Sequence, residues 1–370
     1  MDNENLYEQM LEQDLCKKCH RRKIDRSESP DSVLCKDCRD EMIKLKIPPV
    51  IFICAALTVV LFVITLTPFL GIGSSGIGGF GSGSAGNVDQ LAEEGYVVSA
   101  LDQLVSMLEE NPDNHRTAIK LTDIAMKYSY FDYAAYAINN YLVGVEVSDS
   151  NYYKLQRYIS KLNIYYDTLD VVEEAWVSLE DQAEEAGELD EAQTLALLDE
   201  CMKKISGYIG NSSYNQAYLY YSLAYLSQDT DQRLAYLEKC VEEDPCVFDA
   251  QSQIAVIYRG RGQLDKAREV IEAAHNVNRQ DYSILRAYAT IELVSGNTEA
   301  GCSYASMAWD TYPEGTYVAD TYIIALAANG QEEDARNLLK QCEEEGYIFE
   351  DDLYQFLSGE ITLEDYYYNG

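Results

Sequence analysis

Hydrophobic and polar residues follow two patterns along this chain, an unbroken apolar run and a longer helical alternation. The run covers residues 47–70, which are 24 residues without a charge. As a helix it is roughly 35 Å long at about 1.5 Å per residue, enough to cross a hydrocarbon core of about 30 Å. A buried core helix of this length would show a polar stripe, and a cleaved signal peptide would not follow 46 residues that carry charges and cysteines. The run therefore predicts a single transmembrane helix.

The charges on either side of this segment predict its orientation. Residues 1–46 contain ten Lys or Arg, whereas the first basic residue after the segment is Arg116. The positive-inside rule then places the N-terminus in the cytosol and the C-terminal domain outside. Of the net charge of −35, about −34 falls on the C-terminal side. An outer domain this acidic repels nucleic acids and anionic lipids, so neither is an expected partner.

The second pattern has a period of 34 residues and runs through the C-terminal half. Each period holds two amphipathic helical stretches, and small residues return at fixed places where two helices approach closely. The recurring turn glycines and small residues are Gly262, Gly296 and Gly330, and Cys240, Ala274, Ala308 and Cys342. The pattern predicts four helix pairs over residues 214–346.

These residues resemble the tetratricopeptide repeat (TPR), in which a helix, a tight turn and a second helix form each unit. The resemblance implies an all-α, TPR-like helical-repeat solenoid over residues 88–370, with a concave groove that is lined by the first helix of each unit and binds a protein or peptide. In phase with the repeats, the groove-facing residues are Tyr218, Tyr225, Asp249, Arg259, Arg286, Thr290, Tyr317 and Asp320.

The two arginines of this set stand out in so acidic a domain. Arg259 and Arg286 suit a ligand carboxylate, which a guanidinium binds through two parallel hydrogen bonds. Salt bridges to neighbouring Asp or Glu are the commoner use of such arginines, and the sequence favours that alternative.

The repeat is less regular outside residues 214–346. A unit over 115–141 falls on the 34-residue interval, and residues from Trp176 to Ala196, including Gly187, match a further unit that is out of register with both neighbours. Residues 149–171 are helical in pattern and read either as half a unit or as an insertion. At the other end we expect an end helix from 351–357, then a capping box at Thr362 and Asp365 before an acidic, tyrosine-rich tail.

The N-terminal head contains two CxxC pairs, and fifteen residues separate them. Each pair turns two sulfurs toward one metal, and two pairs complete the tetrahedron of a four-thiolate zinc site. The predicted ligands are Cys16, Cys19, Cys35 and Cys38. Residues 15–42 resemble a zinc-ribbon or treble-clef knuckle, and the cofactor is a structural Zn because no coordination position stays open. Redox motifs and unliganded thiols are the alternatives.

The outer domain shows no catalytic constellation. Its five cysteines form no CxxC, and Cys240 and Cys342 fall on packing positions, so we expect buried thiols rather than disulfides. Its histidines, His115 and His275, are isolated, and its carboxylates lack calcium-loop spacing. We therefore expect neither an enzyme nor a small-molecule substrate.

These features together predict a single-pass membrane scaffold or adaptor at a bacterial cell envelope. Its parts are a cytosolic zinc head (residues 1–46), a transmembrane helix, a glycine- and serine-rich flexible linker (71–87) and an extracytoplasmic solenoid that binds a protein or peptide. The alternative is a transmembrane sensor that relays ligand binding by the solenoid to a cytosolic partner of the zinc head. The long glycine linker argues against a rigid relay.

Overall fold

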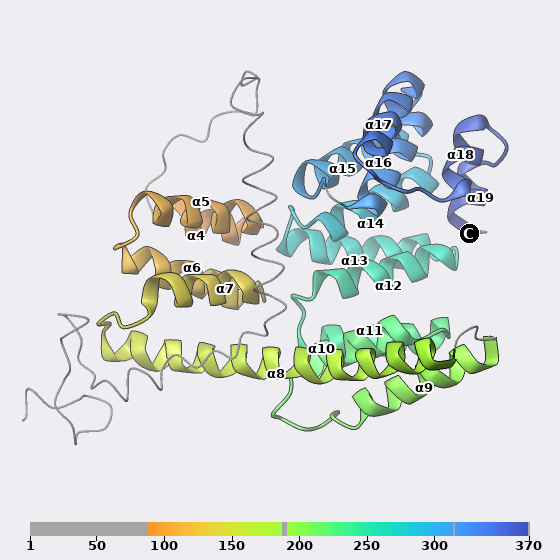
Figure 1. Ribbon diagram of the computed structural model, residues 1–370. Coiled ribbons are helices and arrows are strands. Elements are labelled where there is room, and N and C mark those ends of the chain that lie inside the picture. Colours follow the sequence, from red (N-terminus) through yellow and green to blue (C-terminus); the bar gives the residue numbers. More distant parts are fainter. Residues whose placement is uncertain (1–86, 187–190, 314, 369–370) are drawn as a thin grey trace, which may run out of the picture. The chain divides into compact units, whose positions relative to one another are not determined.

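The computed structural model describes residues 87–186, 191–313 and 315–368 (Figure 1). The predicted zinc head, the predicted transmembrane segment and the linker up to residue 86 lie outside these residues. Every regular element in the described residues is a helix, which confirms the predicted all-α class. The elements are α4 (Asn87–Glu93), α5 (Val97–Glu110), α6 (His115–Lys127), α7 (Phe131–Ala137), the π-helical turn η2 (Ile138–Leu142), α8 (Asp149–Ala186), α9 (Glu191–Ser206), α10 (Gln216–Leu226), α11 (Thr230–Glu243), α12 (Phe248–Gly260), α13 (Leu264–Val277), α14 (Tyr282–Val294), α15 (Thr298–Thr311), α16 (Thr316–Ala328), α17 (Glu332–Glu344), α18 (Asp351–Ser358) and α19 (Leu363–Tyr368).

The described residues divide into two compact units. The first contains residues 103–174 and 213–215, and the second contains the remaining described residues from 88 onward. In the first unit, α6 packs against α7 and η2. Asn114 caps α6, because its side chain accepts a hydrogen bond from the Thr117 backbone N–H at 3.3 Å. Leu121 and Ala134 are fully buried between these helices, in agreement with the helical unit predicted for residues 115–141.

A single helix of 38 residues, α8, contributes to both units. It runs through the region that the sequence left open as half a unit or an insertion, and Trp176 lies within it. The unit matched from Trp176 to Ala196 covers the end of α8 at Ala186 and the start of α9 at Glu191, and its turn residue Gly187 lies outside the described residues. Neither glycine nor proline occurs in α8, so no helix-breaking residue interrupts it.

The second unit contains four consecutive helix pairs, α10/α11, α12/α13, α14/α15 and α16/α17, and these confirm the predicted pairs over residues 214–346. Three of the pairs have a glycine in the turn between their helices, with φ of 70° at Gly262, 84° at Gly296 and 80° at Gly330. This left-handed backbone suits glycine because an L side chain clashes there. The described residues of this unit therefore form a TPR-like helical solenoid.

Small residues let the helices of each pair approach closely. Ala274, Ala308 and Cys342 lie on the second helices and are no more than 1% exposed. At Gly301 of α15 even a methyl group is too large, because an added Cβ would lie 2.6 Å from Leu293 Cγ on α14. The 34-residue spacing of small residues thus has a packing cause.

The C-terminal helices finish the second unit. Leu353 of α18 is fully buried in the last hydrophobic cluster, and α18 packs on α16. The predicted capping box is present, because Thr362 Oγ1 accepts from the Asp365 backbone N–H at 3.1 Å while Asp365 Oδ2 accepts from the Thr362 backbone N–H at 2.9 Å. The short helix α19 then folds back onto α14 (Figure 1).

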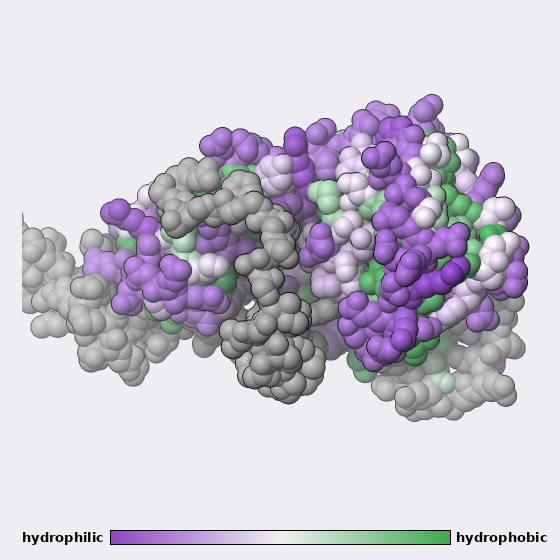
Figure 2. Space-filling view, turned by 90° about the horizontal axis from the view of Figure 1, so that it is seen from above, coloured by the Kyte–Doolittle hydropathy of each residue, from purple (hydrophilic) through white to green (hydrophobic). Residues whose placement is uncertain are grey.

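The surface of the described residues is mainly hydrophilic on the face shown in Figure 2, and hydrophobic residues form smaller patches. The exposed aromatic side chains in the second unit include Tyr225 (65%) and Tyr317 (45%). Both residues belong to first helices of the repeat pairs, so the helices that were predicted to line the groove also carry exposed aromatic surface.

Candidate functional site: the groove of the repeat

The candidate site lies along the first helices of the repeat pairs. The first helix α14 packs directly on α12 and on α16, so these three helices form a continuous inner layer, while no comparable packing joins the described second helices α13, α15 and α17 to one another. In a helical repeat, an inner layer of first helices is the layer that lines the concave surface, which we call the groove. The C-terminal helix α19 lies against it, at α14 (Figure 1).

Arg259, near the end of α12, is a buried cation in this layer. Its side chain belongs to a residue that is only 8% exposed, and its guanidinium lies over the ring of Tyr367 from α19, with 4.6 Å between Cζ and the ring centroid. Its Nε is buried and has no hydrogen-bond partner. Desolvation lowers the pKa of Arg259, and the nearby positive charge of Arg286 lowers it further. The guanidinium stays charged at neutral pH, and no carboxylate within the described ranges forms an ion pair with it.

A similar arrangement is found at Arg286 on α14, which is the first helix of the next pair. Its guanidinium lies over the Tyr317 ring at 5.0 Å from the centroid, and its Nε is also buried without a hydrogen-bond partner. Among the described residues, neither Arg259 nor Arg286 forms an ion pair. The sequence favoured salt bridges to neighbouring carboxylates, and the described residues contain none at either arginine. An aromatic ring faces each guanidinium instead, although Asp320 lies near enough to Arg286 for the arginine to lower its pKa.

Asp320, on α16, is the acidic member of the cluster. Both of its carboxylate oxygens lie 2.9 Å from the Tyr366 hydroxyl of α19, which donates to them. Burial raises the pKa of Asp320 to about 6, although the Tyr366 hydrogen bond and the charge of Arg286 act in the opposite direction. Asp320 is therefore engaged by the chain's own C-terminal helix and not by an arginine.

The tyrosine-rich end of the groove is built from α10, α12, α14 and α16. The Tyr221 hydroxyl donates a short hydrogen bond to Asp249, which also accepts from Gln253 at 2.7 Å. Tyr282 stacks on Tyr312 with 4.5 Å between ring centroids. Burial raises the pKa of the Tyr221 and Tyr282 hydroxyls, so both remain protonated donors at neutral pH.

The structure thus separates the eight predicted groove residues into groups. Arg259, Arg286 and Asp320 come together under α19, and Tyr317 joins them through Arg286. Thr290 is only 1% exposed and donates to the Ala287 carbonyl oxygen at 2.9 Å, so its hydroxyl is already used within α14. The other three lie at the tyrosine-rich end: Tyr218 and Asp249 next to Tyr221, and Tyr225 against Trp176.

Two residues of the site were missed by sequence reasoning, Tyr366 and Tyr367. The capping box signalled a helix at this place, but helical periodicity does not say onto which surface a six-residue helix docks. The run of adjacent tyrosines in the C-terminal tail is a sequence feature that could have indicated contacts between this tail and the groove arginines.

Catalytic and metal chemistry find little support in the described residues. No three His, Cys, Asp or Glu come together there as a metal site, and the four predicted zinc ligands lie outside them. All five described cysteines are free thiols, as expected, and burial raises the pKa of Cys240 to about 12, so its nucleophilic thiolate is scarce at neutral pH.

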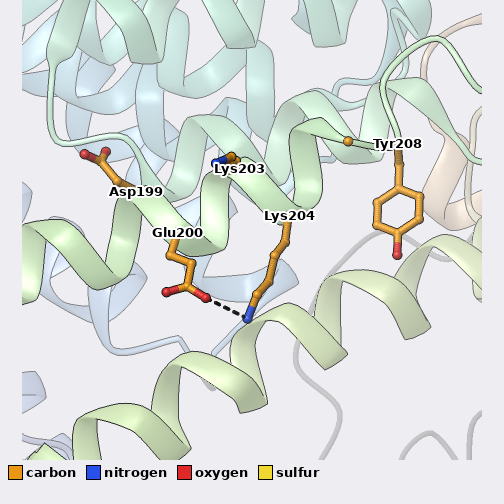
Figure 3. A pocket seen from close by; sticks show the side chains of 6 residues that line it. Asp199, Glu200, Lys203, Lys204 and Tyr208 are labelled. Carbon is orange, nitrogen blue, oxygen red and sulfur yellow. Dashed lines mark ion pairs between the residues drawn. The ribbon is translucent and has the colours of Figure 1, made fainter.

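A hollow on α9 is a second surface feature of the second unit. It is lined by exposed residues of α9 and the following turn, and Glu200 and Lys204 form an ion pair of 3.5 Å at its edge (Figure 3). Its lining carries two acidic and two basic side chains, since Asp199 and Lys203 are also present. No buried nucleophile or acid–base pair faces it, so it offers no catalytic arrangement.

None of the helices in the described part of the chain is long and apolar enough to span a membrane. The predicted segment at residues 47–70 lies outside that part, so the transmembrane helix stays a prediction.

No protein-family model and no curated protein match this sequence. Solved structures do show similarity. MamA (residues 41 to the end) from Desulfovibrio magneticus RS-1 has 13% identity over 47% of this chain and 94% of its own, with a TM-score of 0.33. Yeast Tom70 has 12% identity over 70% of this chain and 61% of its own, with a TM-score of 0.35. YrrB, titled a TPR protein with an unusual peptide-binding site, has 14% identity over 58% of this chain and 95% of its own, with a TM-score of 0.27. Similarities this distant say nothing of function, which is argued below from the groove itself.

Proposed function

We propose that this protein is a membrane-anchored, non-enzymatic scaffold that binds a protein or peptide partner in the groove of its helical repeat. The observation that carries the proposal is the pair of neighbouring arginines, the buried Arg259 and the half-buried Arg286, whose buried Nε atoms have no hydrogen-bond partner and which form no ion pair among the described residues. A buried charge without a counter-ion costs free energy, and a ligand that supplies the anion recovers it. An arginine on the surface does not require an anionic ligand, because water solvates its charge.

The negative net charge of the chain limits which anionic ligands can reach Arg259 and Arg286. The chain carries 63 acidic and 28 basic residues, so its long-range field favours cationic partners and repels anionic ones. An anionic group reaches Arg259 and Arg286 only as part of a partner whose other contacts hold it in the groove. This favours a folded protein or a peptide with aromatic contacts over a free inorganic anion.

The membrane anchor and the zinc head of the proposal rest on the sequence alone. The apolar segment at residues 47–70 would fix the solenoid at the outer surface, and the four cysteines Cys16, Cys19, Cys35 and Cys38 would bind a structural zinc in the cytosolic head. Protease added to whole cells should then digest the solenoid and spare the head.

The groove is tested by chemical crosslinking of the full chain in its own membranes, followed by identification of the proteins recovered. The double variant R259Q/R286Q should lose the partner that the wild type recovers. The matched control is R336Q, which removes an arginine that is exposed on α17 and paired with Glu332 at 3.0 Å. Equal recovery by R259Q/R286Q and the wild type would refute the groove as the binding site.

A further inference from the structure

We propose that the helix α19 is a built-in occupant of the groove, and that a partner binds by displacing it with an aromatic side chain followed by a carboxylate. This inference rests on the proposed function, because it names how the same groove is closed and which peptide chemistry opens it. Three sets of observations support it.

The first set shows that α19 occupies the site itself. Tyr366 donates to both oxygens of Asp320 at 2.9 Å, and the Tyr367 ring lies under the Arg259 guanidinium. The helix α19 therefore contacts both the acidic residue Asp320 and the basic residue Arg259. No partner can reach Asp320 or the ring-facing side of Arg259 while α19 remains docked.

The second set shows that the occupant satisfies the site only in part. The Tyr367 hydroxyl oxygen is buried and has no hydrogen-bond partner, and the Nε atoms of Arg259 and Arg286 are in the same condition. Each unsatisfied buried group disfavours the docked state. A ligand that adds a carboxylate next to its aromatic side chain would supply an acceptor to the arginines, so it has an advantage over the chain's own helix.

The third set shows that α19 is able to leave without unfolding the repeat. A helix of six residues is too short to be stable alone in water, so α19 depends on the groove for its structure. The fully buried side chain at this end of the core is Leu353 of α18, whereas Leu363, Tyr366 and Tyr367 of α19 pack against the cluster while only partly buried. The chain reverses after α18 at Gly359, whose φ is 81°. Release of α19 would expose the groove and leave α18 in place.

The position for the carboxylate follows from the contact between Arg259 and Tyr367, with 4.6 Å between the guanidinium Cζ and the ring centroid. Tyr368 is the next residue of the same helix, in keeping with its effect on the pKa of Arg259. A glutamate at this position is therefore the substitution that would bring a carboxylate toward Arg259 while the two preceding tyrosines keep their contacts. The acidic and aromatic sequence Leu-Glu-Asp-Tyr-Tyr-Tyr of α19 is itself a template for the displacing peptide.

The test compares the full-length wild type with an open variant, Y366A/Y367A, in a binding assay with a fluorescein-labelled peptide Thr-Leu-Glu-Asp-Tyr-Tyr-Tyr that, like the second peptide below, is amidated at its C-terminus. The open variant should bind this peptide at least about tenfold more tightly than the wild type, because the tail competes at an effective concentration on the order of 1 mM. The control Y354A removes a tyrosine of α18 whose hydroxyl donates to Glu343, outside the groove, and should bind like the wild type. Adding R259Q/R286Q to the open variant should abolish binding.

A second peptide, Thr-Leu-Glu-Asp-Tyr-Tyr-Glu, tests the carboxylate. It should bind the open variant about tenfold more tightly than the first peptide, as expected for a new charge-assisted hydrogen bond. Equal or weaker binding would overturn the carboxylate part of the proposal. Equal binding of the first peptide by the wild type and the open variant would overturn occupancy by α19, as would no binding by the open variant at about 1 mM peptide.

Hydrogen exchange in the full-length wild type provides a measurement that does not depend on an added peptide. The amides of α19 should exchange more slowly than in an unfolded chain, and in the open variant they should lose this protection while α18 keeps it. Unprotected α19 amides in the wild type would show that the helix is not docked.

The outcomes also separate this inference from the proposed function. Partner recovery that depends on Arg259 and Arg286 but is the same in the wild type and in Y366A/Y367A would overturn the tail inference and leave the scaffold intact. Partner recovery that is independent of the arginines would refute the groove function, and hydrogen exchange would still decide whether α19 is docked.

Discussion

The close approach of α14 and α15 gives a quantitative test of the repeat packing. Gly301 lies in α15, and a Cβ added there would be 2.6 Å from Leu293 Cγ, 2.8 Å from Leu293 Cδ2 and 3.1 Å from the Ala289 carbonyl oxygen. Real side chains do not tolerate the first two distances, and Leu293 is itself only 1% exposed, so it has little room to move. The substitution G301A therefore forces the two helices apart or moves Leu293 out of its preferred position.

Two effects oppose each other in G301A. Replacing a helical glycine with alanine favours the helix by about 1 kcal/mol. Inserting a methyl group into a filled core disfavours folding by about 1–3 kcal/mol. Because the clash involves a buried side chain and a backbone oxygen, we expect the steric effect to be larger. The predicted net result is a loss of about 1 kcal/mol in the free energy of unfolding.

The matched control is G260A, at the last residue of α12. A Cβ at Gly260 would meet nothing within 4 Å, so only the helix preference acts, and the free energy of unfolding should rise by up to about 1 kcal/mol. Both variants are compared with the wild type by urea unfolding of the full chain, followed by far-ultraviolet circular dichroism. If G301A stabilises the protein as much as G260A, the packing at the small-residue positions is not as close as described.

Three further predictions concern titration, thiols and metal. Since burial raises the pKa of Asp320 to about 6 from its usual value of 3.8, the folded state binds this proton more tightly than the unfolded chain. Its contribution to stability is therefore largest below about pH 4 and is lost as the pH rises through about 6, a change of up to about 3 kcal/mol at about 1.4 kcal/mol per pKa unit. Urea unfolding of the wild type and D320N between pH 4 and 7 should show this difference, and parallel stability curves would contradict it. Cys240, which is 0% exposed, should react with iodoacetamide only after denaturation, and rapid labelling of the native protein detected by mass spectrometry would contradict its burial. The purified full chain should contain one zinc per molecule by elemental analysis, and C16S/C35S should contain none; equal zinc in both would place the metal elsewhere.

The repeat turns, the packing positions and the capping box could be predicted because each depends on residues that are close in the sequence or that recur at a fixed interval. The turn glycines require a left-handed backbone, and the small residues Ala274 and Ala308 are needed where helices meet, so both leave a period in the sequence. The burial of Cys240 and Cys342 follows from the same register. The capping box at Thr362 was also predictable, since its two hydrogen bonds join residues three positions apart.

Other parts of the fold and the site depend on contacts between residues that are far apart in the sequence. The repeat pattern does not predict such contacts. The repeat phase predicted that Arg259 and Arg286 share one surface, but not that Tyr367 and Tyr317 would face them in place of carboxylates. Tyr366 and Asp320 are 46 positions apart, so their hydrogen bond leaves no mark in the local pattern. The helical pattern of residues 149–171 was visible in the sequence, but the pattern did not decide between half a repeat unit and an insertion, and the structure shows one continuous helix through this region.

The most direct test of the groove as a binding site is site-specific photocrosslinking in cells that express the full chain. A photoreactive p-benzoylphenylalanine replaces Tyr317, which is 45% exposed and lies beside Arg286. The control position is Met307, which is 41% exposed on the second helix α15. We predict a crosslink to a second protein from position 317 that disappears in R259Q/R286Q, and none from position 307. Equal crosslinking from both positions, or a crosslink from 317 that survives the loss of both arginines, would contradict the account.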